Sequence, residues 1–173
     1  MSDLSIVIPA LEHKQDAMEY RRECLEQDGY IHGSTGLHNY EIYEDWLNTT
    51  EKNKHNPSPG IVTGTVYFGI CNGKIIGTIA IRHYLNETLL IRGGHIGYGV
   101  RPSERRKGYA TKMLALALVE CKKLGIDKAL VTCDKDNTGS SRTIQKNGGV
   151  LENEFVDDAG GITLRYWIEI NTI

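Results

Sequence analysis

A basic loop lies between a predicted strand and a predicted helix in the segment 97–111. We expect the strand to end at Pro102 and the helix to begin near Gly108, directly after three basic residues at 105–107. The first amides of a helix have no partner inside it, and the helix dipole favours negative charge there. Gly108 lacks a Cβ, so a ligand can come close to the main chain. The segment therefore predicts a cradle for a diphosphate. A basic turn that only caps the helix is the simpler alternative.

Two other phosphate-binding patterns fit less well. The sequence contains no Gly-x-x-x-x-Gly-Lys-Ser/Thr segment, which excludes a P-loop. Gly97-Tyr-Gly99 begins like the fingerprint of dinucleotide-binding domains, but Pro102 stands at the third glycine position. A proline there would hinder the close helix–strand packing that the fingerprint needs.

The spacing Arg105-x-x-Gly108-x-Ala110 resembles the coenzyme A pyrophosphate loop of the GNAT superfamily of N-acetyltransferases, which reads Gln/Arg-x-x-Gly-x-Gly/Ala. The resemblance implies an acyl-CoA-dependent N-acetyltransferase that uses acetyl-CoA as co-substrate and needs no metal. It also implies the cofactor-binding residues, which are Gly99, Val100, Arg105, Arg106, Lys107, Gly108, Tyr109, Ala110, Thr111, Asn137 and Ser140. At the level of motifs it covers residues 97–149.

Asn137 opens the second segment that resembles the family. In the family, an asparagine at this place contacts the pantetheine arm of the cofactor. Asparagine is also a favoured helix N-cap whatever the function, and the two roles are compatible. Many relatives carry a tyrosine seven residues later, which protonates the leaving thiolate. Here that position is Ile144, which has no proton to donate, so another residue or solvent must serve.

Acetyl transfer to an amine needs a proton acceptor and a hydrogen-bond donor for the oxyanion. His95 is the first candidate for the general base, because histidine titrates near neutral pH. Tyr98 is the second candidate for a proton role. A structural hydrogen bond for His95 and core packing for Tyr98 are the alternatives. The resemblance implies that the backbone N–H of Val100 or a near neighbour is the oxyanion donor. Gly97 and Gly99 suit a strand that a ligand approaches closely, or they simply relieve packing.

The acceptor is expected to be a primary amine on a small molecule or a peptide. Asp28, Arg82 and His83 are candidates for its pocket, although surface placement explains each of them equally well. The missing tyrosine leaves a second function open, a catalytically silent module that binds acyl-CoA as a sensor.

The composition is typical of a globular protein, with 40% hydrophobic and 24% charged residues in 173. A net charge of −2 gives no electrostatic reason to expect nucleic acid or an anionic membrane as partner. The start of the chain lacks a signal-peptide pattern, and no run approaches the roughly 18 apolar residues that span a bilayer. Four widely spaced cysteines without a Cys-x-x-Cys pair indicate reduced thiols. We therefore expect a cytoplasmic protein.

The hydrophobic pattern predicts one α/β (α+β) domain over residues 1–173, in the order β-α-α-β-β-β-α-β-α-β-β. Strands are expected at 4–8, 63–71, 74–82, 89–100, 128–133, 150–156 and 162–170, and helices at 11–27, 40–52, 110–124 and 137–147. Asn72-Gly73 predicts a type I′ hairpin turn. The order resembles the acyl-CoA N-acyltransferase fold, with a mixed, mostly antiparallel sheet flanked by about four helices. The alternating last strand can pair with a second chain to form a homodimer.

Overall fold

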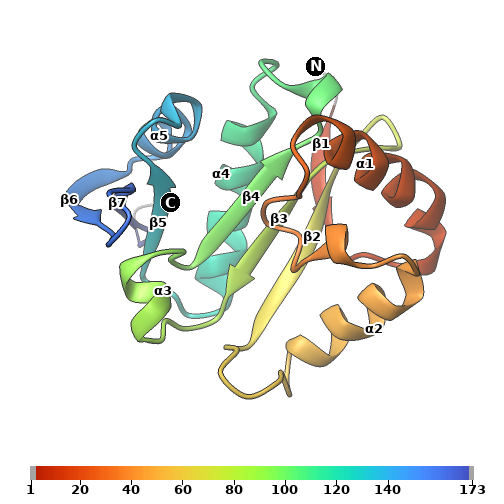
Figure 1. Cartoon of the computed structure of the whole chain (residues 1–173), viewed down its shortest axis with the longest axis horizontal. Helices are drawn as coiled ribbons and strands as arrows, with labels where there is room; N and C mark the ends of the chain where they lie inside the picture. The colour runs from red at the N-terminus through yellow and green to blue at the C-terminus, as the bar shows by residue number, and fades with distance from the viewer. Residues whose placement is uncertain (1–2, 172–173) are drawn as a thin grey trace.

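The computed structural model describes residues 3–171, and its strands form two antiparallel sheets (Figure 1). The first sheet has the order β1 (Leu4–Val7), β2 (Gly64–Cys71), β3 (Lys74–Arg82) and β4 (Ile96–Val100). The second has the order β5 (Lys128–Asp134), β7 (Ile162–Glu169) and β6 (Val150–Val156). The predicted order of the main elements is confirmed, and the predicted sheet is divided in two between β4 and β5.

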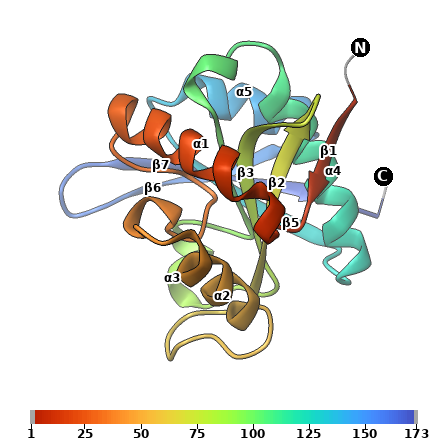
Figure 2. The same cartoon turned by 90° about the vertical axis from the view of Figure 1, so that its right-hand side faces the viewer.

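Helices cover both faces of the first sheet (Figures 1 and 2). The helices are α1 (Lys14–Gln27), α2 (Tyr43–Asn53), α3 (Glu87–Ile91), α4 (Tyr109–Lys123) and α5 (Thr138–Lys146). Phe68 and Ala80 belong to a core formed with α1 and α2, whereas their neighbours Tyr67 and Ile79 belong to a core formed with α4 and α5. Because successive strand residues point to opposite faces, this division places α1 and α2 opposite α4.

The segment 89–95 is not a strand, so the prediction of a strand over 89–100 is wrong in its first half. Helix α3 occupies part of this segment because the side chain of Asn86 caps it, accepting a hydrogen bond from the N–H of Leu89 at 2.9 Å. Gly93 and Gly94 then turn the chain with φ angles of 110° and 62°. β4 therefore begins only at Ile96.

The predicted hairpin between β2 and β3 is confirmed. Asn72 and Gly73 have φ angles of 52° and 75°, as both central residues of a type I′ turn require. The long β2–β3 pair that results is the centre of the first sheet.

The last strand does not offer the edge that the sequence led us to expect. β7 pairs with β5 on one side and with β6 on the other, so both of its edges are used within the chain. The predicted pairing through an edge of this strand therefore has no free edge to use, and the homodimer itself stays a prediction.

β4 touches the second sheet at only one end. An isolated bridge joins Gly94 to Val131, and the N–H of His95 donates to the carbonyl oxygen of Leu130 at 2.8 Å. Beyond this contact β4 and β5 belong to different sheets. Helix α5 and the start of α4 border the space where the two strands separate (Figure 1).

The register of β3 and β4 determines which amides of β4 face that space. Arg82 N–H donates to His95 O and Arg101 N–H donates to Ile76 O, each at 2.7 Å, which marks both as hydrogen-bonded pairs. Such pairs alternate with non-hydrogen-bonded pairs along an antiparallel ladder. The N–H groups of Tyr98 and Val100 therefore point away from β3, toward the separation between the sheets.

The loop between α1 and α2 lies directly on β4. The carbonyl oxygen of His32 accepts a hydrogen bond from the hydroxyl of Thr78 at 2.8 Å. A Cβ at Gly99 would lie 2.9 Å from the same oxygen, and a Cβ at Gly33 would collide with the carbonyl oxygen of Gly97. The two glycines of β4 thus accommodate the protein's own 30–36 loop on this face of the strand.

Candidate active site

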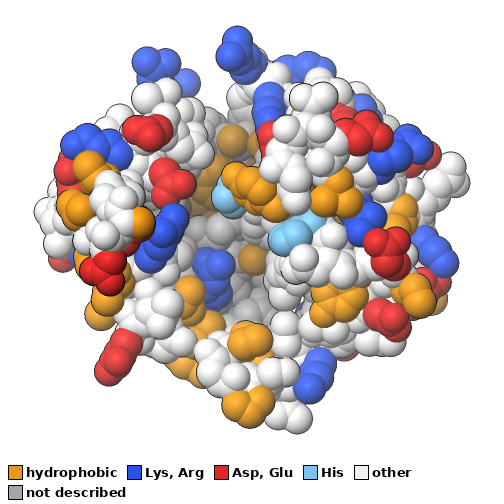
Figure 3. Space-filling view, viewed as in Figure 1, with side chains coloured by type: hydrophobic (Ala, Val, Ile, Leu, Met, Phe, Trp, Pro, Cys, Tyr) orange, Lys and Arg blue, Asp and Glu red, His pale blue; other side chains and the backbone are white. Residues whose placement is uncertain are grey.

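Three hollows meet beneath the 30–36 loop, and Tyr30 and His32 line all of them. The cradle hollow, of about 620 Å³, includes Val100, Gly108, Asn137 and Arg142 in its lining. The central hollow, of about 270 Å³, includes Gly97, Tyr98, Thr132 and Asp134. The loop hollow, of about 680 Å³, includes Ile31, Val66, Ala80 and Leu89. Figure 3 shows this face of the molecule hollowed between the β6–β7 side and the α1–α2 side, with Lys or Arg side chains inside.

Gly108 begins helix α4 in the conformation that the diphosphate prediction requires. Its φ is 81°, in the left-handed region, and no atom lies within 4 Å of the place a Cβ would take. No side chain caps the helix, so its first amides have no hydrogen-bond partner of that kind. Main-chain N–H groups at 109–111 therefore border the cradle hollow, together with the positive end of the helix dipole. This arrangement fits a diphosphate.

The three predicted basic residues of the cradle differ in their surroundings. Arg105 forms an ion pair with Asp28 and also donates to the carbonyl oxygen of Val100 at 3.1 Å. Lys107 pairs with Glu104 at 2.8 Å and does not line the hollow. Arg106 lines it and has no ion-pair partner within residues 3–171. Its guanidinium is therefore the most available of the three for an anion.

Two further cations border the cradle hollow and were missed by the sequence reasoning. Arg142 and Lys146 of α5 line it, and neither has an ion-pair partner in the described part of the chain. Their spacing of four residues places both on one side of a helix. That spacing, in a helix already expected to open at the cofactor, was the signal that could have identified them.

Tyr98 lies where the cradle hollow meets the central hollow. Its hydroxyl is 2.7 Å from the hydroxyl of Ser140 on α5. Burial raises the pKa of Tyr98 to about 12, so the phenol keeps its proton at neutral pH. A buried, protonated hydroxyl at this junction can donate a hydrogen bond or a proton to a group held there.

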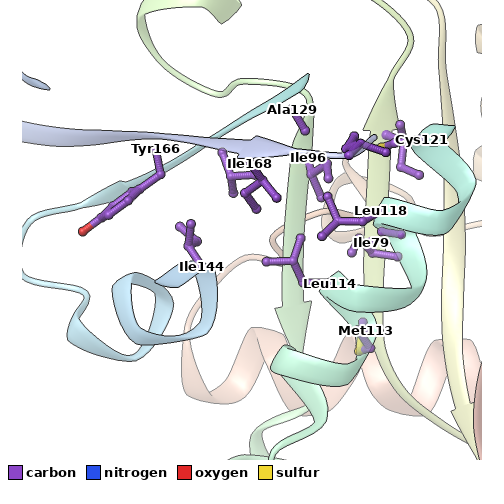
Figure 4. Packing of buried hydrophobic residues seen from close by; sticks show 14 of the residues in the cluster. Ile79, Ile96, Met113, Leu114, Leu118, Cys121, Ala129, Ile144, Tyr166 and Ile168 are labelled. Atoms are coloured by element: carbon purple, nitrogen blue, oxygen red, sulfur yellow. The ribbon is translucent and has the colours of Figure 1, made fainter. Parts of the chain in front are cut away.

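Ile144 lies one helical turn beyond Ser140 and is completely buried. Figure 4 shows its side chain directed toward Ile168 and Tyr166 of β7. The position that carries a tyrosine in many relatives is thus part of the hydrophobic core here. A tyrosine hydroxyl that reaches α5 beside the hollows comes instead from Tyr98, on β4.

Asn137 acts as the N-cap of α5. Its side-chain oxygen accepts a hydrogen bond from the N–H of Ser140 at 3.0 Å. Asn137 and Ser140 both line the cradle hollow and the central hollow. The capping role and a position beside a ligand therefore occur together.

His95 is held away from the hollows. Its Nδ1 accepts a hydrogen bond from the N–H of Leu130 at 2.9 Å, and its ring packs against the edge of Trp167. Within residues 3–171, His95 does not line any of the three hollows. Burial, with a smaller effect from Arg82, lowers the pKa of His95 to about 4. The geometry gives His95 the task of joining β4 to β5 and argues against its expected role as general base.

His32 is the histidine that faces the hollows, and the sequence reasoning did not select it. Its Nε2 lies 2.9 Å from the hydroxyl of Tyr30. Burial lowers the pKa of His32 below the usual value, so the imidazole is neutral near pH 7 and able to accept a proton. A histidine in a glycine-rich loop was the available signal, because binding residues concentrate on loops that a rigid scaffold positions.

The three residues predicted for the acceptor pocket lie in different places. Asp28 is on the cradle hollow, where it pairs with Arg105. His83 is held between the hydroxyls of Thr63 at 3.0 Å and Thr65 at 2.9 Å, outside the lining of the three hollows. Only Arg82 lines both the central hollow and the loop hollow.

Comparison with known families identifies one match to the sequence. The model of the acetyltransferase (GNAT) domain matches residues 8–150. No curated protein sequence gives a significant match.

Several solved structures similar to this chain are described as acetyltransferases. A GNAT-family acetyltransferase from Bacillus anthracis has 22% identity and a TM-score of 0.67, covering 99% of this chain and 98% of its own. RimL, a ribosomal L7/L12 alpha-N-protein acetyltransferase solved with coenzyme A, has 15% identity and a TM-score of 0.74, with 98% and 96% covered. A putative acetyltransferase from Salmonella typhimurium solved with acetyl-CoA has 12% identity and a TM-score of 0.67, with 96% and 94% covered. At these identities the likeness concerns the fold.

No helix within residues 3–171 is both long and apolar enough to cross a membrane. No group of three or more His, Cys, Asp or Glu side chains in the same residues is arranged to hold a metal ion.

Proposed function

Because the chain belongs to the acetyltransferase (GNAT) family, we propose that it transfers an acetyl group from acetyl-CoA to a primary amine. The observation that carries the proposal is the open start of α4 at Gly108, which lines the same hollow as Tyr98. The coenzyme A and acetyl-CoA complexes of the RimL and Salmonella typhimurium structures support it.

The residues present fit coenzyme A. The amides at 109–111 and the side chain of Arg106 would hold the diphosphate, with Arg142 and Lys146 close by for the remaining negative charge. The N–H groups of Tyr98 and Val100 would serve an extended arm or a developing oxyanion. When bound, acetyl-CoA supplies an acetyl group activated as a thioester.

Proton movement is the task left to the side chains. A primary amine with a pKa near 10.4 is almost entirely protonated at pH 7, and freeing it costs on the order of 4–5 kcal/mol. The protonated amine first gives up one proton to solvent. Its nitrogen then bonds to the acetyl carbon, the carbon–sulfur bond breaks, and a second proton passes overall from nitrogen to sulfur. We assign proton acceptance to His32, directly or through water, and proton donation to the thiolate to Tyr98.

The alternative function is a silent acyl-CoA sensor, which the burial of Ile144 at the usual tyrosine position keeps open. Two measurements distinguish the functions. Calorimetry measures acetyl-CoA binding, and a thiol-release assay measures transfer to a panel of amines. Binding with amine-dependent thiol release supports the enzyme. Binding without release from any amine supports the sensor, and absence of binding contradicts both.

A further inference from the structure

Arg82 ends strand β3 between the central hollow and the loop hollow. Its Nη1 donates to the carbonyl oxygens of Gly93 at 3.0 Å and Gly94 at 3.2 Å. These two bonds fix the plane of the guanidinium and leave Nη2 and Nε without an acceptor among the described residues. A Cβ at Gly97 would lie 3.6 Å from both Nη1 and Nη2, so the guanidinium rests against β4 beside Tyr98.

No carboxylate within residues 3–171 forms an ion pair with Arg82. Its pKa is lowered by burial alone, which agrees with a cation that has lost water and gained no charged partner. Arg82 is half-buried, and a charge that has lost part of its water is normally paired, because an unpaired charge is increasingly disfavoured as it loses water. The guanidinium is a rigid fork suited to a carboxylate.

The lining of the loop hollow carries no Asp or Glu among the described residues. The single acidic residue on the described lining of the central hollow, Asp134, is already paired with Arg92 at 3.2 Å. Such surroundings disfavour an acceptor with a second positive charge, such as a polyamine. They favour an acceptor that brings a negative charge of its own.

The loop hollow has an apolar part, beside polar side chains such as those of Thr50 and Asn53. Ile31, Val62, Val66 and Leu89 contribute to its lining, and the volume of about 680 Å³ exceeds that of a single amino acid side chain. Because Arg82 also lines the central hollow, an anion bound to it would lie near the reacting amine. An acceptor that uses these contacts would then be a small molecule that carries an amine, a negatively charged group and an apolar group close together.

We propose that the acceptor is a small amino-carboxylic acid with an apolar side chain, whose carboxylate binds the free edge of the Arg82 guanidinium. Its amine would lie in the central hollow, beside His32, and its apolar side chain in the loop hollow. This inference rests on the proposed acetyl transfer and adds the class of acceptor to it.

The test compares leucine, methionine and phenylalanine with their amides and with spermidine, in the thiol-release assay with acetyl-CoA. We expect the free acids to have KM values at least about tenfold below those of the amides, as a charge-assisted bidentate pair would give. Equal use of acids and amides, or preferential use of spermidine, would overturn the inference.

Variants separate ligand recognition from folding. Arg82→Gln should raise KM for the free acid by roughly ten- to a hundredfold and change KM for the amide little, while Arg82→Lys should lose less. Arg22→Gln, on the exposed surface of α1, is the control and should match the parent protein. An equal loss for acid and amide in Arg82→Gln would indicate a structural role and contradict the proposal.

Binding of the reaction product needs no turnover. Calorimetry with coenzyme A present should show N-acetyl-leucine binding more tightly than N-acetyl-leucinamide, and Arg82→Gln should remove the difference. Equal affinity in the parent protein would refute the acceptor class. If the parent protein did not bind acetyl-CoA at all, the proposed function itself would be refuted.

Discussion

The cradle hollow and the loop hollow meet at Tyr30 and His32, but they offer different parts of the chain to a ligand. The cradle hollow presents main-chain amides at the start of α4, surrounded by several cations. The loop hollow presents apolar side chains and one guanidinium, that of Arg82. One binding surface is thus built from backbone geometry and the other from side-chain choice.

This difference explains why only one of them leaves a recognisable sequence pattern. Main-chain recognition requires glycine at a fixed place, and Gly108 with its φ of 81° meets that requirement. Recognition by side chains can use many residue types at each position, so no fixed motif in the sequence identifies the loop hollow. The following experiments examine the contrast, from the largest expected effect to the smallest.

Gly108→Glu should remove measurable acetyl-CoA binding, because a carboxylate would stand among the amides that face the diphosphate. The matched control is Gly160→Glu, at a glycine with a φ of 84° and equally open surroundings. Both variants carry a similar left-handed strain of about 1–2 kcal/mol. Calorimetry should show loss of affinity in the first alone. Equal affinity in both would disprove the main-chain cradle.

Tyr98→Phe tests the residue at which the cradle and central hollows meet. Without the hydroxyl, kcat should fall by about a hundredfold, whereas the dissociation constant of acetyl-CoA should change little. Stopped assays of thiol release and calorimetry give the two values. An unchanged kcat would leave protonation of the thiolate to solvent.

His32→Gln tests the proton acceptor shared by the hollows. We expect kcat to fall roughly tenfold, since water can perform part of the task. With His32 as proton acceptor, the neutral imidazole would be the active form. Because burial lowers its pKa, the parent kcat should decline only below the ordinary histidine pKa of about 6.5. The variant should lack this decline. If kcat declined in the same way at low pH in both proteins, His32 would be excluded as the proton acceptor.

His95→Ala should have the smallest effect on turnover, within about twofold of the parent, because the side chain lies outside the hollows. Denaturation should instead show a loss of about 1–3 kcal/mol at pH 7, since the N–H of Leu130 would lose its acceptor. A large fall in kcat with unchanged stability would return His95 to the mechanism.

The pH dependence of stability provides a second readout for His95. The folded pKa of about 4 is below the unfolded value near 6.5. The contribution of the neutral ring is therefore complete above pH 6.5 and is lost as pH falls toward 4, by about 3 kcal/mol in total. The unfolding free energy of His95→Ala should decline less over this range. Parallel curves for the two proteins would contradict this effect.

The two histidines show where sequence reasoning succeeds and where it fails. The order of elements follows from local signals, such as Asn72-Gly73 and the apolar spacing in α4, whereas diphosphate binding at Gly108 stays a prediction. The environments of His32 and His95 depend on contacts with Gly99 and Leu130, which lie far away in the sequence. The glycine-rich loop around His32 is a local hint of its place, but no local pattern indicates that His95 joins two strands.

The short strand β4 illustrates a smaller failure. Apolar residues at 89–91 resemble the start of a strand, but a single hydrogen bond from Leu89 to the cap residue Asn86 favours one turn of helix. The choice between strand and helix is thus made within residues 86–89. That segment is shorter than the window in which hydrophobic periodicity is informative.

The contact between the 30–36 loop and β4 limits how the acceptor preference can be redesigned. Side chains introduced at Gly33 or Gly99 would push the loop from the strand, and with it His32. A directed-evolution library should therefore keep both positions as glycine. Diversity belongs at Ile61 and Leu89, which line the loop hollow and belong to neither core.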